Sequence, residues 1–472
     1  MYYFSPHRLR VCIISILIQS LPFLRLSSSL SLDLGLVGFN FELSVFQLND
    51  PKCPVVGHQV SGMSDAFLDI SVPSIDAGIS FGNHRSLRAT IPSDDSRQLE
   101  SLDLSVLRTL EVAFNATFTR SYAALTQHPK DQSSVRPWAG SYWPTASDSI
   151  NYRWDGAESD SMVTKYAKAF GLNPKKLADA VSLKNGIDGL KRRIGARICK
   201  ETIECDPKYT GEAVCSKRDE QYDKDGVCIP TWFGICHAWA VASIMELEPR
   251  CAVKRNNVTF EIQDIKGLIS YIYDDSELAI VYAGNRAYTN DVKFDKFGRP
   301  ELLAVRDITA GDFLISMANI VSLLRKPIIV DIDPISQVWN QPVTSFEITD
   351  HYLVDPTGTS KQVYGVEHYP FNEAMVKLVY MEVQLCWVFE TDSSTVTTSD
   401  DAYAGYQTCR MFYLLIELDA SDTIIGGEYY TYQVNVDFVW APYTSIPPNT
   451  VTRDGFKYSN VKDLITASQK CS

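Results

Sequence analysis

The distribution of eleven cysteines over 472 residues is the feature that most limits how this chain can fold. Four of them, at positions 199, 205, 215 and 228, lie in a polar stretch rich in Lys, Asp, Glu and Gly. Such a stretch has too few apolar side chains to fold through burial alone, so we expect disulfide bonds to stabilise it. A zinc site is the weaker interpretation, because the spacing contains no Cys-x-x-Cys pair.

The N-terminus predicts export to the oxidising compartment that disulfides require. Arg8 and Arg10 precede an apolar run from Val11 to Leu24. Polar residues and a proline interrupt the run, which is too short for a membrane span and is typical of a secretory signal. We therefore predict a signal peptide at 1–26, a propeptide or loosely ordered segment at 27–95, and a catalytic domain at 96–472.

This processing would also simplify the cysteine count. Cys12 would leave with the signal peptide and Cys53 with the propeptide. With Cys236 set aside as a nucleophile, eight cysteines remain, enough for four disulfides whose pairing the sequence does not define. Two sequons, Asn115-Ala-Thr and Asn257-Val-Thr, are compatible with a secreted glycoprotein.

Charge and apolar content exclude several classes of function. The chain carries 44 Lys and Arg against 57 Asp and Glu, a formal net charge of −13. Since no long basic run offsets this charge, we predict no nucleic-acid partner, whereas calcium or cationic substrates would suit an acidic surface. Apolar residues make up 45% of the chain, as in globular proteins, and no segment after the N-terminus is apolar enough to span a membrane.

Helical patterns come first along the chain and strand patterns come later. Apolar residues recur at helical spacing within 99–127, and 161–200 predicts helices interrupted at Asn173-Pro174 and Asn185-Gly186. Beyond residue 326, β-branched and aromatic residues predict strands at 327–331, 377–383, 386–390, 411–418 and 434–439. This order predicts an α+β cysteine-enzyme architecture with a helical N-terminal part and an antiparallel sheet in the C-terminal part.

The segment around Cys236 has the features of a nucleophile at a helix start. Ala238–Leu247 is strongly helix-forming, and Pro249 stops the helix. A helix N-terminus offers free N–H groups and a positive dipole end, which lower the pKa of a thiol and can help to bind an oxyanion. Gly234 permits a close approach to this helix. The alternative interpretation of Cys236 is a core or disulfide-bonded cysteine.

A catalytic base must come from another part of the chain. On a helix His237 would point about 100° away from Cys236, which makes it a poor candidate. Only His351 and His368 lie downstream, roughly 115 and 130 residues after Cys236, at spacings typical of papain-like cysteine enzymes. We predict His368 as the base and His351 as the alternative, although either can be an ordinary surface histidine.

Several short motifs, taken in chain order, resemble the oomycete transglutaminase elicitor family. The most specific is Val338-Trp-Asn-Gln-Pro-Val343, which is similar to the start of the elicitor peptide carried by those cell-wall glycoproteins. After Val343 the sequence diverges from that peptide but keeps Phe346. Further matches, which with the first cover residues 100–460, are Ser141-Tyr-Trp-Pro144, Asn151–Trp154, Cys236-His-Ala-Trp239 with Glu246–Pro249, Tyr369-Pro-Phe-Asn372 and Ile424-Ile-Gly-Gly-Glu428.

The resemblance implies a secreted, calcium-dependent protein-glutamine γ-glutamyltransferase with a papain-like cysteine fold. Cys236 matches the family's Cys-His-Ala-Trp motif and would attack the side-chain amide of a protein glutamine. Ammonia would leave, and a lysine amine would then displace the thiol from the thioester to give an isopeptide crosslink. The implied partners are protein substrates bearing Gln and Lys, cell-wall proteins and a host receptor.

Three tryptophans are candidates for aromatic walls that keep water away from such a thioester. They are Trp232, Trp239 and Trp143. Ordinary core packing explains each of them equally well.

One position departs from the family pattern. A His-Pro-Asp-Phe-type stretch is expected shortly after the Gly-Gly-Glu strand, and here it reads Asn435-Val-Asp437-Phe438. Asp437 remains as a carboxylate that could orient a base, while Asn435 replaces the histidine. If that histidine is the family's base, this paralogue is impaired; if His368 or His351 serves instead, activity is retained.

Calcium ligands and the exposure of the elicitor-like segment are two further expectations. Asp223-Lys-Asp-Gly226 and Asp331-Ile-Asp333 are oxygen-rich, but neither forms a full EF-hand loop, and solvated turns are the alternative. Because a proline cannot donate to a central ladder, we expect the elicitor-like segment on a surface loop or edge strand. That segment consists of Val338, Trp339, Asn340, Gln341 and Pro342.

Three hypotheses therefore remain open for the function. The first is an active transglutaminase, and the second is a papain-like cysteine protease that uses water as the acceptor. The third is a catalytically impaired wall or surface protein whose Trp339–Pro342 segment is only recognised by others. An imidazole within hydrogen-bond reach of the Cys236 sulfur would favour an enzyme, and an amide there would favour a degenerate relative.

Overall fold

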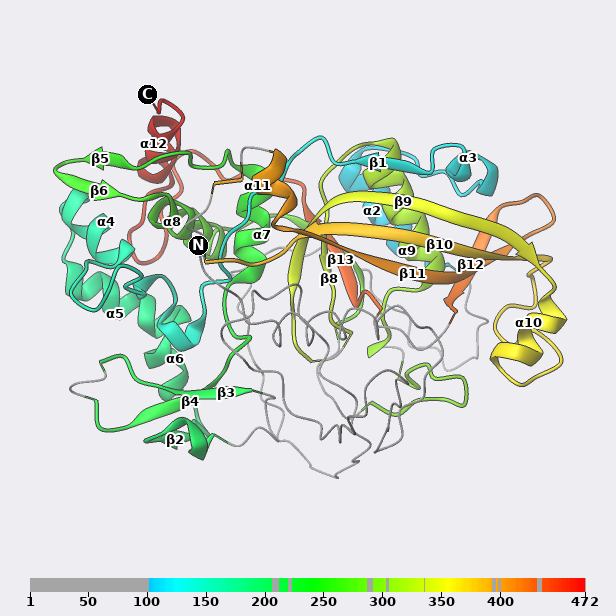
Figure 1. The fold of residues 1–472 in the computed structure, drawn as a ribbon, viewed down its shortest axis with the longest axis horizontal. Helices are drawn as coiled ribbons and strands as arrows, with labels where there is room; N and C mark the ends of the chain where they lie inside the picture. Colours follow the sequence, from blue (N-terminus) through cyan, green and yellow to red (C-terminus); the bar gives the residue numbers. More distant parts are fainter. Residues whose placement is uncertain are drawn as a thin grey trace, which may run out of the picture. The chain divides into compact units, whose positions relative to one another are not determined.

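The computed structural model (Figure 1) describes most of the chain beyond residue 101. The described residues are 102–205, 212–219, 223–286, 292–302, 305–334, 336–392, 396–397, 400–430 and 435–471. All of them fall within the compact unit Leu68–Ser472. The predicted signal peptide and propeptide, 1–26 and 27–95, lie outside the described residues.

Helices dominate the first half of the described chain. Two of the predicted interruptions are confirmed: Asn173 caps a helix whose first residue is Pro174, and that helix ends at Asn185. Between residues 102 and 471 the described α-helices are α2 Leu104–Phe114, α3 Tyr122–Thr126, α4 Met162–Phe170, α5 Pro174–Asn185, α6 Ile187–Lys191, α7 Cys236–Met245, α8 Ile262–Asp275, α9 Ala310–Met317, α10 Pro356–Val363, α11 Asp400–Ala404 and α12 Tyr458–Ser468. Shorter turns are η1 Thr145–Ser147, η2 Ser149–Asn151 and η3 Thr202–Glu204, and α9 continues into the π-helix η5 Ala318–Leu323.

The strands form one large curled sheet and two small ones, and every pairing is antiparallel. The large sheet has the order β12-β11-β10-β9-β8-β13-β7, with β1 paired to β9. Its strands are β1 Lys130–Gln132, β7 Ile280–Gly284, β8 Ile329–Asp331, β9 Asn340–Val354, β10 Lys377–Val388, β11 Gln407–Leu418, β12 Ile424–Tyr429 and β13 Phe438–Pro442. The small sheets contain β2 Ile198–Cys199, β3 Ala213–Ser216 and β4 Gly226–Pro230, and β5 Val253–Arg255 with β6 Val258–Phe260. The predicted helix-then-strand order and the antiparallel sheet are therefore confirmed.

The buried apolar side chains form two large hydrophobic cores and a third, small one. One core joins α7 and α8 to α4, α5 and α12 and reaches the sheet through Phe438 and Trp440. The other packs α2, α9 and η5 against the remaining strands. Helix α7 is buried from Cys236 through Ile244 because it is apolar on all sides, as expected for a helix enclosed by other elements. Figure 1 shows this helix between the helical part and the sheet.

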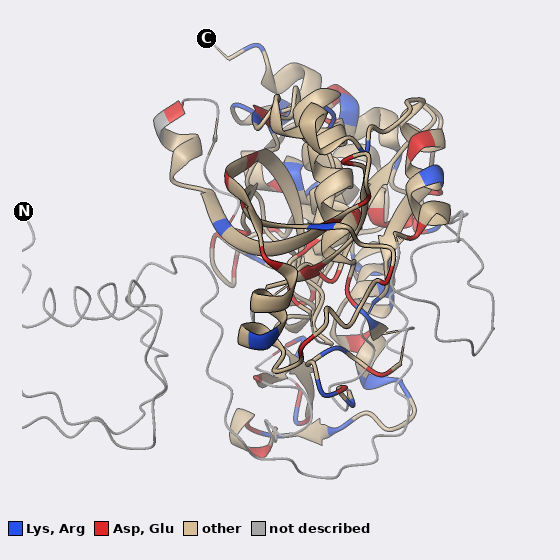
Figure 2. Ribbon diagram, turned by 90° about the vertical axis from the view of Figure 1, so that its right-hand side faces the viewer, with Lys and Arg blue, Asp and Glu red and all other residues tan. Residues whose placement is uncertain are grey.

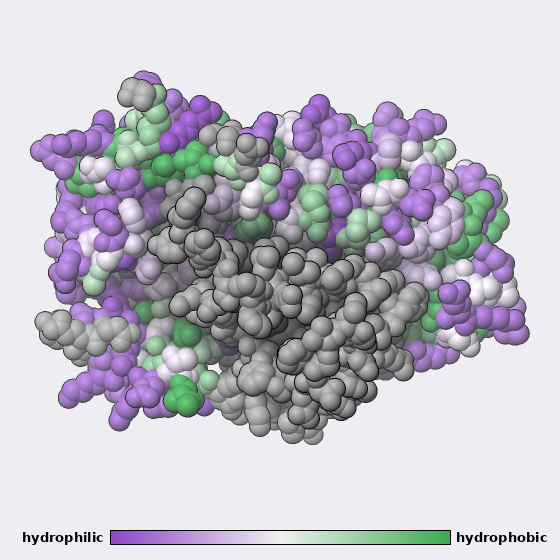
Figure 3. All heavy atoms as spheres, viewed as in Figure 1, coloured by the Kyte–Doolittle hydropathy of each residue, from purple (hydrophilic) through white to green (hydrophobic). Residues whose placement is uncertain are grey.

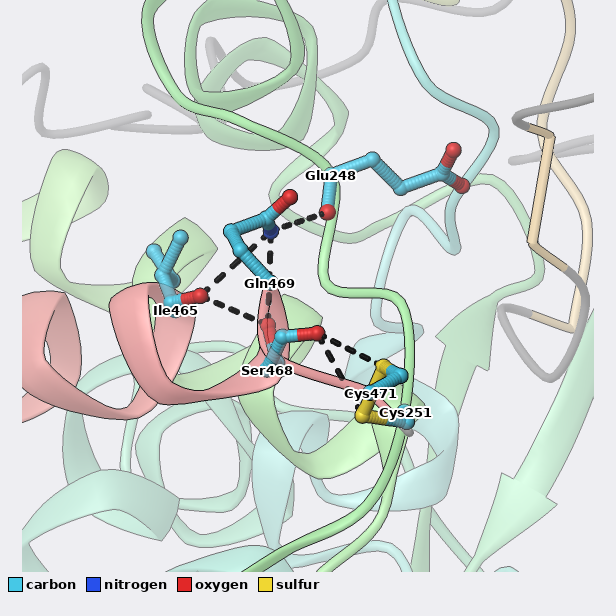
Figure 4. The surroundings of a disulfide bond; sticks show 6 residues. All are labelled: Glu248, Cys251, Ile465, Ser468, Gln469 and Cys471. Carbon is cyan, nitrogen blue, oxygen red and sulfur yellow. Dashed lines mark hydrogen bonds between the residues drawn. A yellow bond between two sulfur atoms is a disulfide. The ribbon is translucent and has the colours of Figure 1, made fainter.

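Four disulfides account for eight of the described cysteines. Cys199–Cys215 and Cys205–Cys228 lie in the polar stretch, and Cys386–Cys409 joins directly opposed residues of β10 and β11. Cys251–Cys471 closes a sequence separation of 220 residues and fixes the end of α12 to the segment after α7 (Figure 4). Beside it, Gln469 Nε2 donates to the Glu248 carbonyl oxygen at 2.8 Å. The predicted stapling of the polar stretch is confirmed.

Charged and apolar side chains are interspersed on the surface of the described elements. Figure 2 shows Lys and Arg mixed with Asp and Glu along the ribbon, and Figure 3 shows apolar positions in small areas among polar ones. The most exposed large apolar side chains are Ile194 and Ile203, before and within the small cysteine-rich unit. In the described part of the chain, no helix combines the length and the apolar content that crossing a membrane requires.

Candidate active site

Cys236 is the first residue of α7, and the residues just before it pack closely against the backbone of Tyr142. A Cβ atom on Gly234 would lie 2.3 Å from the Tyr142 carbonyl oxygen, so only glycine fits there. The Ile235 N–H donates to the same carbonyl at 2.7 Å. The predicted role of Gly234 is confirmed, and Tyr142 is the neighbour that requires it.

Cys236 is the one unpaired cysteine among the described residues. Its side chain is buried, with 6% of its surface exposed. The thiol lies 3.5 Å from the Val338 carbonyl oxygen, to which it donates. The Asn340 side-chain Nδ2 donates to the sulfur at 3.4 Å. The alternative of a disulfide-bonded Cys236 is therefore excluded, and the group within hydrogen-bond reach of the sulfur is an amide.

The elicitor-like segment covers this thiol, and our prediction that it is a surface loop or edge strand is wrong. All five of its residues are buried. The last three of them begin β9, an interior strand of the large sheet. The Val343 N–H donates to the Ile328 carbonyl oxygen, and Pro342 lies opposite Ile329, at the adjacent position of the ladder. Pro342 thus occupies a position where no N–H toward β8 is needed, which is why a central strand tolerates it.

Burial keeps the Cys236 thiol protonated. Loss of solvation raises the pKa of Cys236 to about 12, and the negative charge of Glu390 adds to this effect. Hydrogen bonds from the side chain and backbone of Asn340 act in the opposite direction but do not compensate. The sequence predicted a lowered pKa at the helix start, and in this conformation desolvation outweighs the helix dipole.

Glu390 is a site residue that sequence reasoning missed. Both of its carboxylate oxygens accept hydrogen bonds from Gln341 Nε2, at 2.8 and 2.7 Å. Burial raises the pKa of Glu390 to about 7. A carboxyl group with such a pKa can take up or release a proton near neutral pH. Glu390 is therefore a candidate for proton transfer beside the thiol. Nothing in the local sequence around Glu390 signals this role.

Asn340 connects the thiol to a tryptophan on another strand. Its side-chain Oδ1 accepts a hydrogen bond from Trp440 Nε1 at 2.7 Å, while its Nδ2 contacts the sulfur. Asn340 and Trp440 are both buried. Trp440 lies in β13 between Tyr282 of β7 and Ile329 of β8, so its backbone is held by a strand on each side.

The three histidines considered as a base do not contact the Cys236 sulfur in the described structure. His237 turns away, as predicted, and its Nε2 lies 3.0 Å from Asp274 of α8. His351 contacts Tyr122 and is eleven residues along β9 from Asn340, or roughly 30–36 Å at the rise of an extended strand. The structure therefore does not place our alternative base, His351, near the sulfur.

Our first choice of base, His368, also has no described contact with the sulfur. It is exposed in the loop between α10 and β10. Its neighbour Tyr369 donates to Glu417, whose register partner is Leu378 near the start of β10, whereas Glu390 follows the other end of that strand. Spacing typical of papain-like enzymes thus did not translate into proximity, because the long strands carry both histidines away.

Asn435 and Asp437 lie in the segment that precedes β13. Asp437 is fully buried, and its backbone N–H donates to the Asp331 carbonyl oxygen at 3.0 Å. Asn435 Nδ2 donates to Asp307 at 3.1 Å. Asp437 directly precedes β13 and is three residues before Trp440, about 10 Å at the rise of an extended strand.

The three predicted wall tryptophans belong to the hydrophobic core. Trp143 and Trp239 are buried in the core that surrounds α7 and α8, and Trp232 is partly buried against both cores. Trp239 Nε1 donates to the Trp138 carbonyl oxygen, so its polar edge is already used. In this conformation all three tryptophans pack in or against the hydrophobic cores, as the alternative interpretation stated.

Among the described residues, no three side-chain carboxylates lie close enough together to share a metal ion. Asp331 is buried, and its Oδ1 accepts from the N–H groups of Trp339 and Asp333. Asp225, in the other candidate run, is exposed. In the part of the chain that the structure describes, the group of potential ligand atoms close enough to share a metal ion is formed by three disulfide-bonded cysteines, Cys199, Cys205 and Cys228. These residues do not fit the oxygen-rich coordination that calcium prefers.

Comparison with known proteins identifies the family. The model of the family described as transglutaminase elicitor matches residues 106–471. The chain belongs to the transglutaminase elicitor family. The GP42 transglutaminase from Phytophthora sojae, a solved structure, is 35% identical and superimposes with a TM-score of 0.69, covering 79% of this chain and 100% of that one. No curated protein matches the chain.

Membership of the transglutaminase elicitor family agrees with the geometry at α7. The matched region includes Cys236, Trp440 and the elicitor-like segment. The similarity to GP42 supports a transglutaminase-like enzyme with a mixed helix and sheet fold. A free thiol at a helix start is by itself a weak indication of function. Family membership adds support for a transglutaminase-type function.

Proposed function

We propose that this chain is a secreted protein-glutamine γ-glutamyltransferase, an acyltransferase that forms Gln–Lys isopeptide crosslinks through a thioester on Cys236. The observation that carries the proposal is the free thiol of Cys236 at the first residue of α7. All other described cysteines are paired, so this thiol is spared from the oxidation that stabilises the rest of the fold.

The reaction balances with the groups that a glutamine and an amine supply. The sulfur adds to the carboxamide carbon, the C–N bond breaks, and the thiol proton leaves with nitrogen as ammonia. A lysine amine then forms a C–N bond to the same carbon, the C–S bond breaks, and a proton returns to the sulfur. Glu390, with a pKa of about 7, is the described carboxyl group best suited to carry protons beside the sulfur.

The conformation described here is a resting state in this proposal. The sulfur is covered by Val338 and Asn340, and its pKa of about 12 keeps it as a thiol at neutral pH. A protein glutamine reaches it only after the start of β9 moves aside. Exposure to water would then lower the pKa of the thiol toward its ordinary value, and the N-terminus of α7 would lower it further.

A catalytically impaired paralogue is the second candidate, and a specific observation favours it. The group at the sulfur is the Asn340 amide, and no described histidine other than His237 lies close to Cys236 in the sequence or at the site. Asn435 also stands where the family resemblance leads us to expect a histidine. In that case the chain would be a wall protein without crosslinking activity.

The remaining features of the proposal concern its setting. Four disulfides are typical of proteins that fold outside the reducing cytosol, so we place the enzyme in the extracellular space or the cell wall. Its partners would be cell-wall proteins bearing Gln and Lys, and a host receptor for the elicitor-like segment. Because that segment is buried in the folded chain, receptor recognition would require its exposure. Calcium dependence is proposed from the family resemblance alone, and none of the reaction steps given above uses the ion.

The direct test is incorporation of a fluorescent primary amine into a glutamine-rich protein by the purified chain, with and without calcium and with EDTA. We expect label on the acceptor protein and release of ammonia in equal amounts. Added lysine-bearing protein should give products of higher mass on a denaturing gel. Fragments without crosslinks would support the protease, and the absence of both label and fragments under all three conditions would support the impaired paralogue.

A further inference from the structure

The contact between Asn340 and Cys236 brings a primary carboxamide against the candidate nucleophile. Asparagine and glutamine carry the same –CONH₂ group, and asparagine is shorter by one methylene. In a transglutaminase this is the functional group that the thiol must attack. The Asn340 Nδ2 lies 3.4 Å from the sulfur, so the chain's own carboxamide occupies space that a substrate carboxamide must enter.

The other end of this carboxamide is bound as well. The Trp440 indole N–H donates to Asn340 Oδ1 at 2.7 Å, a short hydrogen bond in a buried setting. An indole N–H is a donor only, so it favours an oxygen that carries or gains negative charge. Its effect is strengthened because few water molecules can compete for it in the dry interior.

We infer that Asn340 is a built-in mimic of the substrate glutamine, and that Trp440 is the catalytic residue that binds the carboxamide oxygen of the substrate. This inference rests on the proposed transglutaminase function and assigns two residues of the same site. When the start of β9 moves aside, the glutamine carboxamide takes the place of the Asn340 side chain. Its oxygen then accepts from Trp440 Nε1.

The observed contact explains why the mimic does not react. A thiol must approach a carbonyl carbon from above the plane of the amide. Here the amide presents its N–H edge to the sulfur, and an N–H donor lies in the amide plane. Asn340 is further fixed by its place in the strand, where it pairs with Asp331 of β8. The contact thus occupies and covers the thiol without an attack geometry.

With a substrate in place, Trp440 would act at the point where charge develops. As the C–S bond forms, the electron pair of the C=O double bond moves onto the oxygen that faces the indole N–H. Breakage of the C–N bond restores the carbonyl and releases ammonia with the thiol proton. A donor that is already positioned by two neighbouring strands needs no reorganisation at this step.

Two substitutions separate the mimic from the oxygen donor. Asn340→Ala removes the covering carboxamide, and we expect iodoacetamide to alkylate Cys236 at least about tenfold faster. Trp440→Phe keeps a ring but removes the N–H, and we expect kcat for amine incorporation to fall by about a hundredfold. Alkylation of Cys236 in Trp440→Phe should be unchanged or faster, because Asn340 loses its anchor.

Trp387→Phe is the matched control, since Trp387 is a buried tryptophan on β10 that packs in the other core. It should leave kcat and the alkylation rate within about twofold of the unmodified chain. Thermal midpoints of all three variants show whether each is folded. An unchanged alkylation rate in Asn340→Ala would overturn the mimic. A kcat in Trp440→Phe within about twofold of the unmodified chain would overturn the oxygen donor.

Failure of the proposed function would look different. An unmodified chain that incorporates no amine under any condition would overturn both the transglutaminase and the catalytic assignment of Trp440. The alkylation of Cys236 does not depend on catalysis, so Asn340→Ala would still decide whether Asn340 covers the thiol. Slow alkylation in the unmodified chain and fast alkylation in Asn340→Ala would support the cover by itself.

Discussion

Replacing Cys236 by alanine should reduce amine incorporation by at least about a thousandfold, to the background of the assay. The sulfur forms the thioester, and no other described cysteine is free to take its place. Alanine keeps the helix start and removes one buried atom, so the fold should be retained. The measurement is the initial rate of fluorescent amine incorporation at saturating glutamine donor.

Ser243→Ala is a suitable control for this change. Ser243 is buried on the same helix, two turns further along, and donates to the Ala240 carbonyl oxygen. It tests whether small truncations in α7 disturb activity through packing alone. Activity in Cys236→Ala comparable to that of Ser243→Ala would mean that another group forms the acyl-enzyme, and our assignment of the nucleophile would be wrong.

The second large effect concerns stability. Replacing both Cys251 and Cys471 by serine should lower the free energy of unfolding by about 5 kcal/mol in the chain-entropy model, at the top of the usual range for a disulfide. The reason is the sequence separation of 220 residues that this bond closes, which strongly restricts the unfolded chain. Urea unfolding followed by tryptophan fluorescence would measure the change.

The Cys386–Cys409 disulfide provides the comparison. It joins opposed residues of β10 and β11 and closes a separation of 23 residues. The same reasoning predicts a loss of about 3 kcal/mol when both cysteines are replaced. If this pair costs more than the Cys251–Cys471 pair, loop closure is not the main source of stabilisation, and native contacts around α12 would have to be weighed instead.

Local features of the fold were predictable from the sequence because they depend on neighbouring residues. The start of α5 follows from Asn173 and Pro174, a side-chain cap and a residue that needs no N–H at the first helical position. The start of α7 at Cys236 follows from the helix-forming run behind it. The strands at 377–383 and 386–390 were predicted separately, and they form one strand, β10.

The surroundings of the thiol were not predictable, because they depend on sheet order and register. Asn340 is 104 residues away from Cys236 in sequence, and no local pattern indicates that β9 passes beside α7. The prediction of an exposed elicitor-like segment considered the missing N–H of Pro342 but not which edge of the strand it faces. Trp440 lies one residue beyond the predicted strand at 434–439, and its role emerged from its contact with Asn340.

In our proposal, the start of β9 accounts for both the resting state and the activity of the chain. The same start of β9 that carries the elicitor-like sequence also covers the sulfur. Burial keeps the sulfur protonated, and displacement of the strand would both admit a glutamine and restore solvation. Exposure of the segment and exposure of the thiol would therefore occur together.

The most direct measurement is alkylation of Cys236 by iodoacetamide, quantified by peptide mass mapping while amine incorporation is followed in the same samples. Because the pKa of the thiol is about 12, its thiolate fraction and its alkylation rate should rise about tenfold per pH unit between pH 7 and 10. The account predicts that residual activity falls in proportion to the modified fraction and reaches zero when Cys236 is fully alkylated. Activity that persists with Cys236 fully modified would contradict it.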